Sequence, residues 1–153
     1  MEYAILHTPI GFLKLVQQEE FLTQVEYVGR QEREILPTTP LLKEAVRQLK
    51  GYFDGELKTF DLPLKPQVTP YRQAVLKELL KVEFGTTTTY KELAAKAGSP
   101  KAARAVGSAM RTNPIVVIIP CHRVLPQSGK LGNYSAGGAA NKEWLLAHEA
   151  QNR

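Results

Sequence analysis

A short segment with two prolines, residues 62–69, divides the chain into two parts that differ in hydrophobic periodicity. Pro63 and Pro66 interrupt helices and central strands alike, so neither pattern continues through this segment. Strand-like patterns and one helix precede it, and several helical patterns follow it. Because 153 residues suffice for two small domains with a buried core, we expect one domain over residues 1–65 and a second over residues 66–153.

The first domain has the pattern of an antiparallel sheet followed by a helix. Three short, partly alternating segments, 2–7, 11–17 and 21–28, are separated by short polar or proline-containing connections. Consecutive strands joined in this way form a meander. From Thr39-Pro40 onward apolar residues recur at helical spacing as far as Phe53, and Gly51 and Gly55 indicate its end.

The second domain begins with two helix signatures. Thr69 followed by proline is an N-cap with proline at the first helical position, and it predicts a helix over 71–82. Thr89 and Glu92 have the spacing of a capping box, which predicts a short helix that ends at Gly98.

A further helix is predicted over 101–111, between Ser99-Pro100 and Asn113-Pro114. Together with the preceding short helix it fits a helix-turn-helix, in which the second helix would be the recognition helix. Arg104 projects from a surface that small residues otherwise keep low: Ala102, Ala103, Ala105, Gly107, Ser108 and Ala109. Such a surface allows close approach to a nucleic acid groove, and it equally allows tight packing against another helix.

The excess positive charge lies in the second domain. Residues 1–65 carry a net charge of −2 and residues 66–153 a net charge of +7, which together give +5. This asymmetry is expected of a module that binds a polyanion beside a neutral domain, although a solubilising surface charge would produce it too.

Nothing in the sequence predicts a membrane partner or a disulfide framework. The longest aliphatic run, residues 115–119, is far too short to span a bilayer. The N-terminus, with Glu2, His7 and Pro9, lacks the pattern of a signal peptide, so we expect a cytoplasmic protein, associated with the nucleoid in a prokaryote. A single cysteine excludes an internal disulfide and a zinc site built from several thiolates.

That cysteine follows the aliphatic run, in Pro-Cys-His-Arg at positions 120–123. The run is predicted to be a buried strand or extended segment, and a lone cysteine there is most often an inert core residue. The adjacent imidazole and guanidinium favour a second interpretation, because a nearby cation stabilises the nucleophilic thiolate. A histidine base needs an orienting group, and Glu149, in a helix that begins at Asn141, is one of two carboxylates after Glu92.

Six segments form a specific combination: Tyr90-Lys-Glu-Leu-Ala, Lys101-Ala-Ala-Arg-Ala-Val-Gly-Ser-Ala-Met, Asn113-Pro114, Ile119-Pro-Cys-His-Arg-Val124, Gly132-Asn-Tyr-Ser and Lys142-Glu-Trp-Leu-Leu-Ala-His-Glu149. In this order and approximate spacing they resemble the O6-alkylguanine-DNA alkyltransferases. The resemblance covers residues 70–149, whereas residues 1–65 match only in general character. It implies an α+β fold, with an N-terminal antiparallel sheet and helix domain that is RNase H-like. A mostly helical domain similar to a winged helix-turn-helix would follow.

The resemblance also implies an activity and the residues that perform it. Cys121 would take the alkyl group from the O6 atom of a damaged guanine in duplex DNA, once per molecule and without an organic cofactor. His122 would act through a water molecule as the base that generates the thiolate. Glu149 would orient the imidazole, and Asn113 would hold the turn around the cysteine.

In similar proteins the helix-turn-helix binds the minor groove and the damaged base is flipped out of the duplex. Arg104 resembles the arginine that enters the base stack in its place, and Tyr90 would lie beside the displaced phosphate and the base. The alkyl pocket would be lined by Met110, Val124, Tyr134 and Ser135, together with Tyr90. Close approach to the groove would use Ala102, Ala103 and Gly107, and phosphate contacts would come from Tyr71, Arg72, Lys91 and Ser99.

Two departures from the family pattern bear on these expectations. The loop between Tyr134 and Gly138 has one residue more than usual, which leaves open whether Ser135 or Ala136 contacts the guanine. The cysteines that hold zinc in the N-terminal domain of some members are missing, so no structural metal is expected. The protein would act as a monomer.

Three other functions remain to be separated from alkyl transfer. An alkyltransferase-like protein would bind the lesion without repairing it, but such proteins lack the reactive cysteine. A helix-turn-helix regulator would leave the Pro-Cys-His-Arg segment and Glu149 unexplained. A cysteine hydrolase would give the cationic helix-turn-helix no role.

Overall fold

The computed structural model describes residues 1–98 and 103–153. Backbone packing divides the chain into two compact units. The N-terminal unit comprises residues 1–67 and 114–116, and the C-terminal unit comprises residues 68–113 and 117–153. Residues 114–116, which lie a few positions before the cysteine, therefore belong to the N-terminal unit. The sequence pattern did not indicate this. Across the described ranges, no helix has the length and apolar character needed to cross a membrane.

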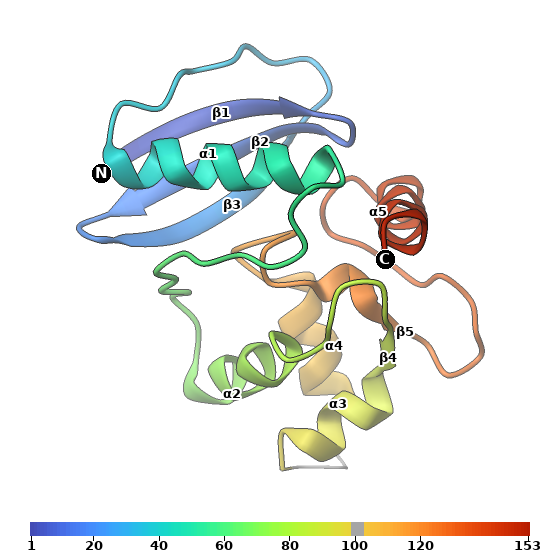
Figure 1. The fold of residues 1–153 in the computed structure, drawn as a ribbon. Helices are drawn as coiled ribbons and strands as arrows, with labels where there is room; N and C mark the ends of the chain where they lie inside the picture. Colours follow the sequence, from blue (N-terminus) through green and yellow to red (C-terminus); the bar gives the residue numbers. More distant parts are fainter. Residues whose placement is uncertain (99–102) are drawn as a thin grey trace. The chain divides into compact units, whose positions relative to one another are not determined.

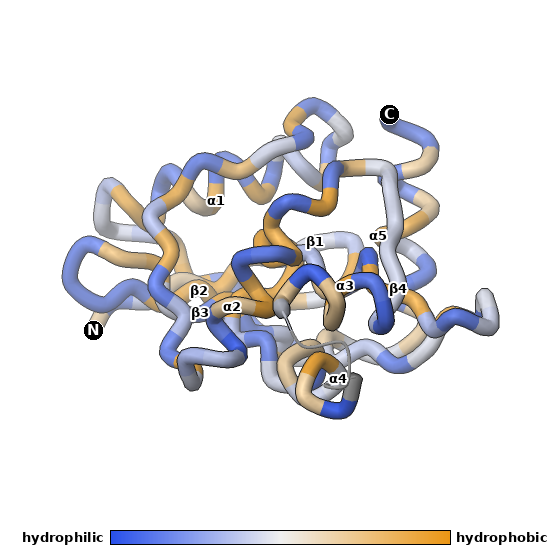
Figure 2. The backbone as a smooth tube through the Cα atoms, turned by 90° about the horizontal axis from the view of Figure 1, so that it is seen from below, coloured by the Kyte–Doolittle hydropathy of each residue, from blue (hydrophilic) through white to orange (hydrophobic). Residues whose placement is uncertain are grey.

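The N-terminal unit is built on a three-stranded antiparallel sheet, in the order β1 (Glu2–Thr8), β2 (Gly11–Gln18) and β3 (Phe21–Gly29). Helix α1 (Pro40–Phe53) packs on one face of it (Figure 1). Hydrophobic and hydrophilic positions alternate along α1 in Figure 2, as expected for a helix with one buried face. The predicted meander and helix are thus confirmed, except that Gly51 lies inside the helix and does not end it.

Short extended segments pair with both outer strands of the sheet. Ile5 of β1 exchanges two backbone hydrogen bonds with Ile35 at 3.0 Å. On β3, Leu22 bridges to Leu64, and Val25 bridges in parallel to Ile115. Covering strand edges in this way satisfies backbone groups that would otherwise be open to another chain.

The C-terminal unit consists of short helices with one small parallel sheet. Helix α2 (Pro70–Leu79) begins with the predicted Thr69 cap but ends three residues before Val82, since the chain turns at Leu80. Strands β4 (Thr88–Thr89) and β5 (Val124–Leu125) pair in parallel and join two parts of the chain that lie far apart in sequence.

The expected helix-turn-helix corresponds to α3 (Tyr90–Lys96) and α4 (Ala103–Arg111), which pack against each other and against α2. Thr89 caps α3 by accepting a hydrogen bond from the Glu92 amide at 3.1 Å, and the Glu92 carboxylate accepts one from the Thr88 hydroxyl. The predicted beginning of the second helix at residue 101 lies outside the described residues. Helix α5 (Ala139–Gln151) begins two residues before the predicted Asn141.

Candidate active site

The cysteine lies in one turn of 3-10 helix, η1 (Cys121–Arg123), after a buried turn. The expected strand or extended segment over 115–119 is wrong beyond Ile115, since residues 116–118 form a turn and Val117 adopts φ of 71°. Positive φ is rare for a β-branched residue and marks local strain. The Asn113 side chain spans this turn, because its Nδ2 donates to the carbonyl oxygen of Ile119 at 2.9 Å. Cys121 is left only 4% exposed.

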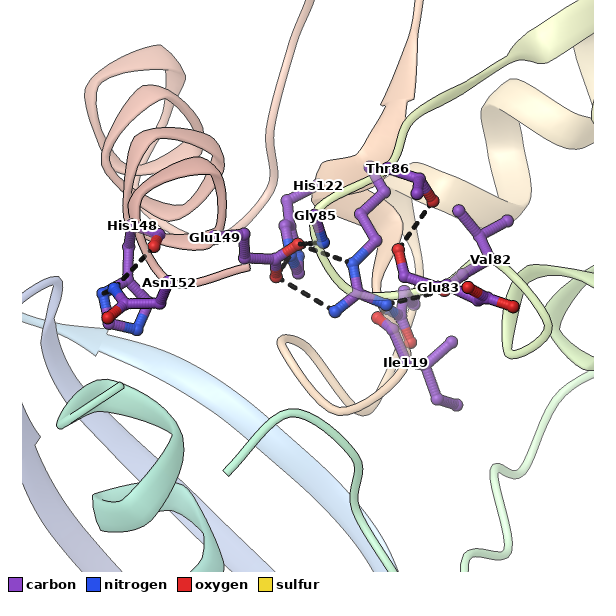
Figure 3. A network of polar contacts seen from close by, with 11 residues as sticks. Val82, Glu83, Gly85, Thr86, Ile119, His122, His148, Glu149 and Asn152 are labelled. Carbon is purple, nitrogen blue, oxygen red and sulfur yellow. Dashed lines mark hydrogen bonds and ion pairs between the residues drawn. The ribbon is translucent and has the colours of Figure 1, made fainter. Parts of the chain in front are cut away.

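The residue after the cysteine contacts the carboxylate that the sequence indicated. His122 Nε2 lies 2.6 Å from Glu149 Oε2, and both side chains are buried (Figure 3). Because an ionised carboxylate only accepts hydrogen bonds, Nε2 carries the hydrogen, and Nδ1 holds the lone pair of the neutral ring. Nδ1 is buried and has no hydrogen-bond partner among the described residues. It is therefore the nitrogen at which His122 can accept a proton.

Glu149 has further partners. Arg123 donates to it from Nε at 2.8 Å and from Nη2 at 3.0 Å, and the Gly85 amide donates to it at 3.2 Å. Figure 3 shows Gly85 and His122 converging on this carboxylate. Burial alone would raise the pKa of Glu149, but hydrogen bonds from His122 and Arg123 outweigh it and hold that pKa well below its ordinary range. The carboxylate is therefore ionised.

Burial also governs the other two groups. It lowers the pKa of His122, and the opposing effect of the hydrogen bond and charge of Glu149 does not restore it. It raises the pKa of Cys121 to about 11, although an Asn113 hydrogen bond and the charge of Lys142 act in the opposite direction. At neutral pH the resting site thus holds a thiol and a neutral imidazole, so the thiol must lose its proton during any reaction.

Cys121 lines a cavity of about 690 Å³ within the C-terminal unit. This volume lies in the range of sites for small organic ligands. Five residues expected near substrate or DNA lie on its wall: Tyr90, Gly107, Met110, Tyr134 and Ser135. Val124, predicted to line the pocket, is fully buried and is not among the described residues that form the wall. Its backbone pairs with Thr88 in the small parallel sheet.

The loop with one additional residue contributes to this wall. Ser135 is exposed and lines the cavity, whereas Ala136 is buried and its carbonyl accepts a hydrogen bond from Asn141 Nδ2 at 2.9 Å. Of the two alternatives, Ser135 has the position from which a bound molecule can be contacted.

The residues expected to bind DNA differ in accessibility. Arg104 and Lys91 are exposed, and Tyr71 and Arg72 are half-buried. Arg72 Nη2 donates to the Ser108 hydroxyl at 2.7 Å, and the Tyr71 hydroxyl is buried with no hydrogen-bond partner among the described residues. Ala103 is the first residue of α4, while Ala102 and Ser99 lie outside the described residues.

Sequence reasoning missed several contacts of the site, although it had named Arg123 as a cation beside Cys121. Arg111 lies on the cavity wall, and Arg123 pairs with Glu149. Lys142 is fully buried, and its Nζ donates to the carbonyls of Val124 at 2.8 Å and Asn133 at 3.3 Å. The signal for Lys142 was its spacing, because positions 142, 145 and 149 share one face of a helix.

Comparisons with known proteins agree with this geometry. The DNA binding domain of 6-O-methylguanine DNA methyltransferase matches residues 70–151, and the ribonuclease-like domain of that family matches residues 1–66. A methylated-DNA–protein-cysteine methyltransferase of Methanosarcina barkeri is 42% identical over 99% of both chains. The human protein of the same name is 40% identical over 97% of this chain and 80% of its own length.

Solved structures give the same result. The chain superposes on the structure of Mycobacterium tuberculosis O6-methylguanine methyltransferase with a TM-score of 0.86 and 39% identity, covering 99% of this chain and 94% of that one. For Mycobacterium tuberculosis OGT in complex with DNA, the TM-score is 0.88 and the identity 41%, with the same coverage. These matches confirm the resemblance and the mixed α/β fold predicted from the motifs.

Proposed function

The chain belongs to the 6-O-methylguanine DNA methyltransferase family, and from this premise we propose that Cys121 takes the alkyl group from O6-alkylguanine in duplex DNA. The protein is a direct-reversal DNA repair enzyme that transfers the group to its own cysteine. One observation carries the assignment: the sequence contains a single cysteine, and it lines the cavity.

The chemistry is a displacement at the alkyl carbon. The sulfur of Cys121 forms a bond to that carbon while the bond between the carbon and guanine O6 breaks, and the electron pair remains on guanine. The thiol proton passes to Nδ1 of His122 through a water molecule and then to the departing guanine, so the product is an unmodified base.

Two residues position these groups in the proposal. Glu149 holds the imidazole through Nε2, and Asn113 fixes the turn before the cysteine through its hydrogen bond to Ile119. The product thioether is stable to water, so each molecule reacts once. No cofactor takes part, and since one unit of one chain supplies the whole site, the protein acts as a monomer.

Binding of duplex DNA is the task of the helix-turn-helix. The O6 atom lies inside the base stack, so the damaged nucleotide must be flipped out to reach Cys121. Helix α4 enters the minor groove, where Ala102, Ala103 and Gly107 permit close approach, and the exposed Arg104 fills the vacated place in the stack. Met110, Tyr134 and Ser135 surround the flipped base and its alkyl group.

The remaining contacts are to the DNA backbone. Tyr90 lies beside the displaced phosphate, and Tyr71, Arg72, Lys91 and Ser99 bind neighbouring phosphates, which provide affinity with little sequence preference. In this proposal residues 66–153 form the domain that binds DNA and transfers the alkyl group, and residues 1–65 form a scaffold.

The decisive experiment follows the alkyl group. Duplex DNA with labelled O6-methylguanine should transfer one label per protein molecule to Cys121, and Cys121→Ala should transfer none. Label released to solvent with repeated turnover would indicate a hydrolase, and binding without transfer would indicate a protein that only recognises the lesion. Either outcome contradicts the proposal.

The flipping role of Arg104 has its own test. Arg104→Ala should slow transfer from duplex DNA much more than transfer from the free base O6-benzylguanine, which needs no flipping. Arg47→Ala, which removes an exposed arginine from α1 in the N-terminal unit, is the matched control. Equal losses with both substrates would argue against the role.

A further inference from the structure

The carboxylate that orients the histidine is shared with a second cation. Glu149 Oε2 receives both His122 Nε2 and Arg123 Nη2, and Oε1 receives Arg123 Nε and the Gly85 amide. The side chains of Arg123 and Glu149 are 7% and 1% exposed, so water screens this pair little. Four donors thus converge on two oxygens, and one donor group carries a permanent positive charge.

Because Glu149 is shared with Arg123, it stabilises the protonated imidazole of His122 less than an unshared carboxylate would. A carboxylate paired only with a histidine stabilises the protonated ring strongly and raises its basicity. Here Arg123 already neutralises Glu149, and the other charged group that acts on His122, Lys142 of α5, is also a cation. Among the described residues, the aromatic ring of Tyr134 also lies near the imidazole, 6.4 Å away between ring centres. The surroundings therefore favour a neutral ring.

Arg123 also contacts the turn between α2 and β4. Its Nη1 donates to the Val82 carbonyl at 2.7 Å, and its guanidinium lies 5.8 Å from the centre of the Phe84 ring. The Gly85 amide reaches Glu149 from the same turn, which leads through β4 to Tyr90. The guanidinium, itself anchored to this turn, and the Gly85 amide therefore fix the orientation of Glu149 together.

We propose that Arg123 is a positioning residue for the transfer reaction, one that fixes Glu149 beside His122 while withholding the carboxylate's charge from the imidazole. The inference rests on the proposed function, because it concerns the base of that reaction. A ring protonated by the thiol gains little stabilisation from a carboxylate that is already neutralised. His122 consequently passes the proton on to the departing guanine and does not retain it.

The test compares the pH dependence of three variants. Single-turnover rates of transfer from duplex DNA fall at low pH as His122 becomes protonated. In Arg123→Met this fall should move to higher pH by about one unit or more, because Glu149 then acts on His122 alone. Arg123→Lys, which keeps the charge but loses the two-point contact, should keep the wild-type midpoint and react several-fold more slowly. Lys81→Met removes an exposed ion pair beside the same turn and should match the wild type.

A folded Arg123→Met protein with the wild-type midpoint would overturn the proposal, whatever its rate. If that variant does not fold, the His122 ring of the wild-type protein is titrated by nuclear magnetic resonance. The ring should stay neutral below pH 6.5, its ordinary midpoint, and a ring already protonated at that pH would overturn the proposal. A wild-type protein that transfers no label contradicts the proposed function instead.

Discussion

Two arginine–glutamate pairs in the molecule have nearly the same geometry and opposite surroundings. On α1, Arg47 donates from Nε and Nη2 to Glu44 at 2.7 and 2.6 Å. In the active site, Arg123 donates from the same two atoms to Glu149 at 2.8 and 3.0 Å. The first pair has side chains that are 66% and 41% exposed, and the second has side chains that are 7% and 1% exposed.

The difference in burial indicates that contact distance alone does not determine what an ion pair contributes to the free energy of unfolding. Water screens the attraction between exposed charges, and either partner of an exposed pair regains hydration when the other is removed. A buried pair has already lost its hydration, so removing one partner leaves an uncompensated charge in the interior. The pair on α1 is therefore dispensable, whereas Glu149 supports both its unit and the reaction.

The largest effect is expected from Glu149→Gln. The substitution keeps the shape of the side chain but leaves the Arg123 guanidinium buried without a counter-ion, which should lower the free energy of unfolding by about 3–5 kcal/mol. Transfer to Cys121 should become much slower, because the ring of His122 is no longer held by an ionised carboxylate. Chemical denaturation and single-turnover kinetics measure the two effects. A variant as stable as the wild type would break the distinction between the two pairs.

A buried cation with uncharged partners should fall between the two pairs. Lys142 donates to two backbone carbonyls, so Lys142→Met removes one charge and leaves two acceptors unsatisfied. We expect a loss of about 1–3 kcal/mol in the free energy of unfolding, measured in urea. Lys142→Arg is not a conservative control, since the larger guanidinium needs more space, whereas Lys43→Met at an exposed position of α1 is a suitable one. Increased stability of Lys142→Met would mean that desolvation of the ammonium outweighs its two hydrogen bonds.

The buried network around Glu149 and the exposed pair on α1 also predict different dependence of the free energy of unfolding on pH. Folding holds the pKa of His122 below its ordinary value of 6.5, so below that pH the unfolded chain binds a proton that the folded chain does not. The free energy of unfolding should therefore fall as the pH decreases from 6.5 towards 5. Hydrogen bonds from Arg47 and Gln48 lower the pKa of Glu44 to about 2, from an ordinary value of 4.5, which places its protonation below this window.

Denaturation between pH 8 and pH 5 tests this expectation. Glu44→Gln should leave the slope of stability against pH unchanged in this window, and His122→Gln should reduce it. A wild-type slope that is flat would show that His122 is as easily protonated in the folded protein as in the unfolded chain.

The sequence predicted most elements because their signals are local. Alternation over 2–7, the helical spacing that follows Thr39-Pro40 and the Thr69 cap depend on residues within a few positions of each other, and all three were confirmed. The strand or extended segment expected over 115–119 was wrong beyond Ile115, because a run of buried aliphatic residues does not distinguish extended backbone from a buried turn. The burial of residues 115–119 was thus predicted correctly, but their backbone conformation was not.

The same reasoning from the sequence predicted only part of the candidate active site. The partners His122 and Glu149 are 27 residues apart, and Gly85 contacts Glu149 across 64 residues, so no local periodicity reports these contacts. Lys142 was overlooked because lysines are rarely buried, although its helical spacing from Leu145 and Glu149 placed it on the buried face. Resemblance to a family supplied the pairing of His122 with Glu149 but not the share that Arg123 has in it.

The smallest effect is expected at the exposed pair, and it is the strictest test of the comparison. Arg47→Ala and Glu44→Ala each remove one partner of a pair whose hydrogen bonds are as short as any in the active-site network, yet the remaining charge stays in water. Both variants should therefore melt within the scatter of repeated wild-type measurements and transfer label at the wild-type rate. Since Glu44 also accepts a hydrogen bond from Gln48 at 2.7 Å, Arg47→Ala is the cleaner of the two. If Arg47→Ala destabilised the protein as strongly as Glu149→Gln, short contact distance and not burial would set the contribution of both pairs.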